Sequence, residues 1–181
     1  PRRLGILIAD VSGKGTSAAF YMAELKGLVL SLSQIYQSPK KLLIEVNRIM
    51  AANIDARSFV TMIYAVLDTD DATLTYARAG HTPLIYLRGQ NGNDRVEVLS
   101  PSGLVVGLEG FDAHFDAMIE EASLDVAKGD IAVLFTDGVS EAMNEDADLF
   151  GEDRLSSLVE EYAGVAVETL RERILTEIDA F

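Results

Sequence analysis

The chain has 181 residues, of which 29 are acidic and 15 are basic, so its formal net charge is −14; it has no cysteine and only two histidines. The lack of cysteine excludes disulfide bonds, thiol catalysis and cysteine-based zinc sites, and two histidines are too few for a three-histidine metal site. A charge this negative argues against nucleic-acid binding through a basic face. The charge is explained by solubility, or by carboxylates that bind cations at a site for a phosphorylated substrate.

The sequence shows no apolar stretch approaching the ~20 residues that cross a bilayer, and no signal-peptide pattern. We therefore expect a cytoplasmic chain with no membrane insertion. The length is sufficient for one domain with a sizeable core, and no internal repeat or linker marks a boundary. A single domain over residues 1–181 is expected.

The first predicted elements are a strand and two helices. Residues 4–10, LGILIAD, are apolar at both odd and even positions, which predicts a strand buried on both faces. Apolar residues then recur every three or four positions over residues 17–36, which predicts a helix; its second half is apolar on nearly all sides and is expected in the core. Ser38 as N-cap and Pro39 at the first helical position start a second helix that continues to Asn53.

The middle of the chain predicts strands. Residues 59–68 and 73–80 are rich in β-branched and aromatic side chains and are joined by an acidic turn, which indicates a hairpin. Residues 82–88 and 95–100 form a second predicted hairpin around the turn GQNGND at 89–94.

The remaining segments predict a loop, two strands and two helices. Residues 101–110 are an irregular loop; residues 113–126 predict a strand, with a helix as the alternative. Residues 131–138, IAVLFTDG, predict another strand buried on both faces, and residues 152–162 and 165–179 predict two helices. Because strands do not alternate with helices, we expect an α+β fold of mostly antiparallel sheets packed against helix pairs.

The segment ADVSGKGTS, residues 9–17, resembles a phosphate-binding loop but lacks its requirements. A Walker loop has a glycine six residues before its lysine and a serine or threonine directly after it. Around Lys14 those positions are Ile8 and Gly15. We reject the Walker loop. The remaining features are an aspartate, Asp10, at the end of a strand, a glycine-rich turn and a helix.

Asp137 ends its predicted strand in the same way as Asp10. Two such carboxylates within ~4 Å of each other would repel by about 4 kcal/mol at an effective dielectric constant of 20, unless one pKa rises or a cation lies between them. Oxygen ligands select hard cations such as magnesium, manganese or calcium. The alternative is that each aspartate only ends its strand in a side-chain-capped turn.

Several segments in order resemble one family. GILIADVSGKGTSAAFYMAELKGLV, FVTMIYAVLD, LTYARAGHTPLIYLR, KGDIAVLFTDGVSEAMN and LFGEDRL are similar to segments of the PPM metal-dependent protein phosphatases, in the bacterial SpoIIE and RsbU-like branch. The resemblance covers nearly the whole chain. It implies a four-layer αββα sandwich with a two-metal site at one edge of the paired sheets.

The resemblance also implies the ligands and the chemistry. Asp10 would bridge two manganese or magnesium ions, the Val11 carbonyl would be a further ligand, and Asp137 would bind one ion. A water between the ions would attack phosphorus in line, without a phosphoenzyme. From the residues alone, Lys14 and the turn at Gly15 and Thr16 precede a helix whose N-terminal amides could contact a phosphate, although a solvated lysine is the favoured interpretation.

Substrates and partners follow from the same resemblance. The substrate class is a protein carrying phosphoserine or phosphothreonine, such as a STAS-type anti-anti-sigma factor, and an upstream sensor domain is implied; a homodimer is left open. The family also has a Gly-Asp-Phe-Tyr-Asp motif before this segment and an Asp-Asp-x-Thr-Leu motif after it, and the sequence contains neither. We therefore expect a domain shortened at both ends. The alternative function is a degenerate, non-catalytic binding or sensing module.

The two histidines have less specific contexts. His81, in the segment AGHTP, is expected to shape a turn, with a general-acid role as the less favoured alternative. His114 is expected on the surface of a strand.

Overall fold

The computed structural model describes residues 2–89 and 95–181, which form two compact units. The first unit comprises Pro1–His81 and Pro101–Val126, and the second comprises Thr82–Ser100 and Ala127–Phe181. Each unit is described by itself. No helix in these described ranges combines the length and the apolarity needed to cross a bilayer.

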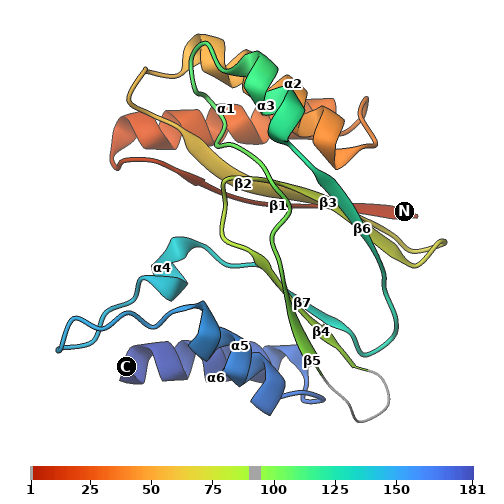
Figure 1. The fold of residues 1–181 in the computed structure, drawn as a ribbon, viewed down its shortest axis with the longest axis vertical. Helices are drawn as coiled ribbons and strands as arrows, with labels where there is room; N and C mark the ends of the chain where they lie inside the picture. The colour runs from red at the N-terminus through yellow and green to blue at the C-terminus, as the bar shows by residue number, and fades with distance from the viewer. Residues whose placement is uncertain (1, 90–94) are drawn as a thin grey trace. The chain divides into compact units, whose positions relative to one another are not determined.

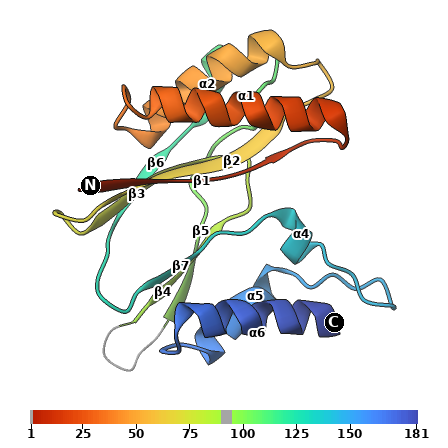
Figure 2. The same ribbon diagram turned by 180° about the vertical axis from the view of Figure 1, so that it is seen from behind.

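The first unit is an antiparallel sheet with helices on one face (Figure 1). Its strand order is β1-β2-β3-β6. The strands are β1 (Arg3–Val11), β2 (Val60–Asp68), β3 (Thr73–Ala79) and β6 (Glu121–Asp125), and the helices are α1 (Thr16–Leu32), α2 (Pro39–Asn53) and α3 (Asp112–Met118). Figure 2 shows α1 and α2 side by side over the sheet.

The core of the first unit lies between the helices and this face of the sheet. Alternate residues of β2, including Met62 and Tyr64, face the helices, as the strand period of two requires. Leu43 and Met50 of α2 are fully buried against them. Burial of each such side chain contributes roughly 1.5–3 kcal/mol, so this face fixes the register of the sheet.

The start of α2 confirms the predicted cap. The Ser38 side chain accepts a hydrogen bond from the Lys41 amide at 3.2 Å, and Pro39 is the first helical residue. Glu121 of β6 adds a contact that lies 83 residues away in sequence: its carboxylate accepts the Ser38 hydroxyl at 2.6 Å and the Lys40 amide at 2.9 Å. A carboxylate is favoured here because the helix N-terminus carries partial positive charge.

The second unit is a smaller sheet, of order β5-β4-β7, packed against two helices. The strands are β4 (Leu84–Arg88), β5 (Arg95–Leu99) and β7 (Ile131–Val133), and the helices are α4 (Asp137–Ser140), α5 (Glu152–Glu161) and α6 (Val167–Ala180). Ile85 and Leu87 of β4 pack with Leu155 and Val159 of α5. Both predicted hairpins pair as expected, and residues 90–94 of the second turn lie outside the described residues. The predicted α+β class is confirmed.

Asp130 ties the start of β7 to β4 in this unit. Its carboxylate accepts the Tyr86 hydroxyl at 2.6 Å, the Ala127 amide at 2.8 Å and the Gly89 amide at 2.9 Å. Burial works to raise the pKa of Asp130, but these hydrogen bonds together hold it below its usual range. Burial and the bond to Asp130 raise the pKa of Tyr86.

The Asp130 hydrogen bonds predict a pH-dependent contribution to stability. Because the pKa of Asp130 is lower in the folded chain, its stabilisation is complete above the unfolded value of about 4 and is lost as pH falls through the folded value. We expect Asp130→Asn to lower the free energy of unfolding by about 2 kcal/mol at pH 7, and by less at pH 3, in urea titrations. The exposed Asp116→Asn serves as control. The prediction would be contradicted if the difference in free energy of unfolding between Asp130→Asn and wild type did not become smaller below pH 4.

The predictions that β1 is buried on both faces and that α1 is buried on nearly all sides were wrong. Among the described residues β1 is an edge strand of its sheet, and Val11 is the one residue of β1 that is buried. α1 packs through one side only: Leu25, Val29 and Leu32 are buried, whereas Phe20 and Leu30 are 75% and 62% exposed. Apolar composition alone does not distinguish an edge element from a central one, because burial depends on the number of neighbours that the topology supplies.

Two other elements differ from their predicted form. Residues 113–126 are not one strand: Phe115 and Ile119 are buried at helical spacing around α3, and alternation begins only in β6. His114 therefore lies on a helix, where it is exposed. The strand predicted at 131–138 keeps only Ile131–Val133 in the ladder, and it too is an edge strand rather than buried on both faces.

Candidate metal centre

Asp10 lies in the first unit, at the end of β1, and is exposed. The β1–β2 ladder places it opposite Thr61, and Val11 opposite Val60 closes the ladder. The chain just beyond is held by two hydrogen bonds with Phe59: the Ser12 amide donates to the Phe59 carbonyl at 2.9 Å, and the Ser12 hydroxyl accepts the Phe59 amide at 2.8 Å. The backbone that carries Asp10 is therefore anchored on both sides.

The predicted phosphate contacts lie between Asp10 and the first turn of α1. Gly15 has φ 92°, in the left-handed region that favours glycine, and it precedes the first helical residue, Thr16. The first amides of a helix have no partner within it, and here the N-cap side chain supplies none either. Lys14, Gly15 and Thr16 are all exposed. The turn thus presents backbone N–H donors and the positively charged side chain of Lys14.

Asp137 lies in the second unit, at the start of α4, and is also exposed. The preceding Phe135 is buried, and its carbonyl accepts a hydrogen bond from the Thr82 hydroxyl. The Glu141 amide donates to the Asp137 carbonyl at 2.7 Å and closes the short helix. Asp137 is therefore held by the buried segment after β7 on one side and by a helical turn on the other.

The donors supplied by these segments fit a hard divalent cation. Asp10 offers carboxylate oxygens at the end of β1, Asp137 offers them at the start of α4, and Val11 offers a backbone carbonyl. Magnesium takes oxygen ligands and keeps several waters, so it needs few protein ligands. Within the described ranges, neither unit contains a group of three His, Asp or Glu side chains that would hold an ion by itself.

His81 is buried, at 4% exposure, and the structure gives it a partner that sequence reasoning missed. Its Nδ1 lies 2.8 Å from the Thr61 hydroxyl, and its carbonyl accepts the Arg78 guanidinium at 2.6 Å. Gly80, with φ 63°, makes the turn that leads into it. The signal that could have found Thr61 is its position as the polar residue in the apolar run FVTMIYAVL.

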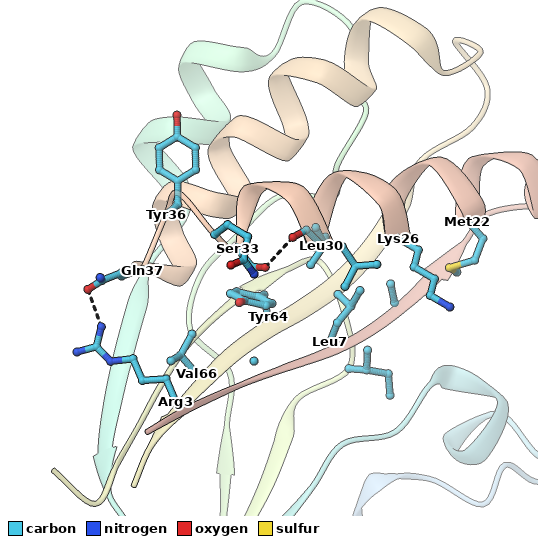
Figure 3. A pocket seen from close by; sticks show the side chains of 15 residues that line it. Arg3, Leu7, Met22, Lys26, Leu30, Ser33, Tyr36, Gln37, Tyr64 and Val66 are labelled. Atoms are coloured by element: carbon cyan, nitrogen blue, oxygen red, sulfur yellow. Dashed lines mark hydrogen bonds between the residues drawn. The ribbon is translucent and has the colours of Figure 1, made fainter. Parts of the chain in front are cut away.

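A groove of about 710 Å³ lies between α1 and strands β1 and β2 (Figure 3). Leu7, Met22 and Tyr64 contribute apolar surface to it, and Lys26 extends along it from α1. Arg3 at one end donates to the Gln37 side chain at 2.5 Å. The lining residues include no carboxylate and no histidine, so the groove offers none of the ligands that a hard cation requires.

Comparison with solved structures defines the class of fold. The SiaA-PP2C domain of Pseudomonas aeruginosa superposes with a TM-score of 0.80, at 16% identity over 99% of this chain and 73% of that one. RsbX, solved in complex with magnesium, superposes with a TM-score of 0.69, at 15% identity over 97% of this chain and 74% of that one. The chain therefore has the fold of PP2C-type phosphatase domains.

The sequence comparison gives the family. The chain belongs to the Stage II sporulation protein E (SpoIIE) family, whose sequence pattern matches residues 1–181. Phosphoserine phosphatase RsbU of Bacillus subtilis is 39% identical over 161 residues, which cover 88% of this chain and 45% of that protein. The chain thus spans less than half the length of this relative. The resemblance to the SpoIIE and RsbU-like branch is confirmed.

Proposed function

We propose that this chain is the catalytic part of a metal-dependent phosphoserine phosphatase. The observation that carries the proposal is the position of Asp10, which is exposed at an anchored strand end directly before a glycine turn and an uncapped helix N-terminus. This segment supplies a carboxylate that can bind a cation and N–H groups that can donate hydrogen bonds to a phosphate, all within seven residues. The family, and a relative named as a phosphoserine phosphatase, support the assignment.

In this proposal, Asp10 and the Val11 carbonyl bind magnesium or manganese, and Asp137 is a metal ligand as well. When bound, such ions supply an acidified water as nucleophile and neutralise charge on the phosphoryl group. The amides at Gly15 and Thr16 donate to phosphate oxygens, and Lys14 pairs with the phosphate charge. Asp10 lies on rigid strand backbone, so little reorganisation is needed when the phosphate arrives.

We further propose that the substrate is a phosphorylated regulator, such as a STAS-type anti-anti-sigma factor, in the cytoplasm. An upstream sensor domain and a homodimer belong to the same proposal. This proposal is supported by the 39% sequence identity to RsbU over 88% of the chain. Phosphoserine rather than phosphothreonine is favoured because that relative is named for it.

The metal requirement gives a direct test of the function. Treatment of the full-length protein with a chelator is expected to abolish phosphate release from a phosphoserine protein, and excess magnesium or manganese is expected to restore it. The reason is that the proposed nucleophile is a water acidified by the bound ions, and the chain has no cysteine that could replace it. Release is measured as free phosphate over time, with chelator pre-saturated with magnesium as control. Release that persists without metal contradicts the metal-dependent mechanism, and no release at any metal concentration favours the non-catalytic module.

A further inference from the structure

Three polar residues form a series from the interior to the surface of the first unit. His81 is buried, Thr61 is half-buried and Asp10 is exposed. Asp10 and Thr61 are partners in the β1–β2 ladder, and the Thr61 hydroxyl lies 2.8 Å from Nδ1 of His81. The three residues come from three different segments, so only the folded sheet brings them together.

We propose that His81 and Thr61 are positioning residues for the Asp10 carboxylate. Nδ1–H of His81 donates to Oγ1 of Thr61, and the Thr61 hydroxyl donates to one carboxylate oxygen of Asp10. The inference rests on the proposed function, because it concerns how Asp10 is presented to a divalent cation. It assigns no proton transfer to either residue.

The geometry of the ladder permits this series of hydrogen bonds. Directly opposed residues of an antiparallel pair project from the same face, with Cβ atoms about 4.5–5.5 Å apart, so a hydroxyl can reach a neighbouring carboxylate. A threonine hydroxyl carries one donor and two acceptor lone pairs, so Thr61 can accept from His81 and donate to Asp10 at the same time. Nδ1 is a donor in one of the two neutral tautomers of His81.

The inner end of the series is rigid. The Arg78 guanidinium binds the His81 carbonyl at 2.6 Å and the Pro101 carbonyl at 3.0 Å, which ties the turn at His81 to the loop that follows β5. A Cβ added at Gly80 would collide with the side chain of Val105, so the turn before His81 is closely packed. The backbone that carries the imidazole is thus held by these contacts.

The expected benefit is a carboxylate with a fixed orientation. An exposed aspartate without a donor samples several rotamers, whereas a donor on one oxygen selects one orientation and leaves the other oxygen for a cation. Carboxylates that bind metals are commonly hydrogen-bonded in this way, and loss of such a partner typically costs 10–100-fold in metal affinity. We expect a loss of about tenfold or more when the Thr61 hydroxyl is removed.

The experiment compares Thr61→Val with Thr61→Ser in the full-length protein. The affinity for manganese, measured by calorimetry, is expected to fall about tenfold or more in Thr61→Val and to stay near wild type in Thr61→Ser, which keeps the hydroxyl. His81→Leu is expected to lower the affinity, and His81→Asn, which keeps a donor near Nδ1, to retain more of it. Thr75→Val is the matched control, because Thr75 makes a 3.0 Å hydroxyl bond to Ser123 across the same sheet.

The tautomer of His81 provides a readout that does not depend on activity or on the stability of variants. Nitrogen NMR of wild-type protein without metal is expected to show the proton on Nδ1. A proton on Nε2 would overturn the inference, as would Thr61→Val binding manganese like wild type while Asp10→Asn does not. If Asp10→Asn itself binds metal and releases phosphate normally, the proposed function fails instead, so the two failures are distinguishable.

Discussion

Asp10→Asn is expected to lower kcat/KM for phosphate release from a phosphoserine protein by at least about a hundredfold. The substitution keeps the size of the side chain but removes the negative charge that holds the cation. Charge stabilisation by a bound metal is worth several kcal/mol, and each 1.4 kcal/mol of transition-state stabilisation changes the rate tenfold. Initial rates of release by the full-length protein, at saturating magnesium or manganese, measure the effect.

The matched control for this prediction is Asp125→Asn. Asp125 also ends a strand of the same sheet, β6, but at the opposite edge of the strand order from β1. Its substitution is expected to leave kcat/KM within a factor of two of wild type. Thermal unfolding of both variants separates a loss of the site from a loss of the fold. Normal activity of Asp10→Asn, with the fold intact, would refute the assignment of Asp10.

Asn47→Ala is expected to lower the free energy of unfolding by about 3 kcal/mol. Asn47 is only 2% exposed, on α2. Its amide group donates to Asp112 at 2.9 Å, and its carbonyl oxygen accepts the Gly107 amide at 3.0 Å. A buried donor left without a partner costs about 1–3 kcal/mol, and alanine leaves a cavity as well. Urea unfolding monitored by circular dichroism measures the loss.

Asn53→Ala provides the control on the same helix. Asn53 lies at the exposed end of α2, where its amide donates to Glu24 and to the Ile49 carbonyl at 3.1 Å each. Because water can replace these bonds, the expected loss is below about 1 kcal/mol. Equal losses for the two variants would show that Asn47 does not act as a buried link between α2 and the loop at 101–110.

Local patterns were sufficient for most elements. The cap at Ser38, the acidic turn between β2 and β3 and the spacing of the terminal helices each depend on residues a few positions apart, and the structure confirms all three. The pattern failed at 113–126, where a short helix passes into a strand within two residues. The seven-residue helix has one buried residue, Phe115, and its C-cap Ile119 is the next, which is too few to establish a period.

Some residues of the candidate site can likewise be recognised from local sequence, whereas others cannot. Asp10 and Asp137 are recognisable in sequence because each follows an apolar strand and precedes a glycine-containing turn. Thr61 is not recognisable as a neighbour of Asp10, since the register between β1 and β2 pairs residues 51 positions apart. The role of Glu121 at the start of α2 is hidden for the same reason.

The amino-acid order by itself determined the α+β class, the family motifs and the two candidate aspartates, because each of these depends on neighbouring residues. The tertiary structure alone decided which strands are edges, which side of α1 is buried, which polar groups meet His81 and which residue lies opposite Asp10 in the sheet. Burial and hydrogen bonding between distant segments depend on strand order and register, and these are properties of the whole packed sheet rather than of any one segment.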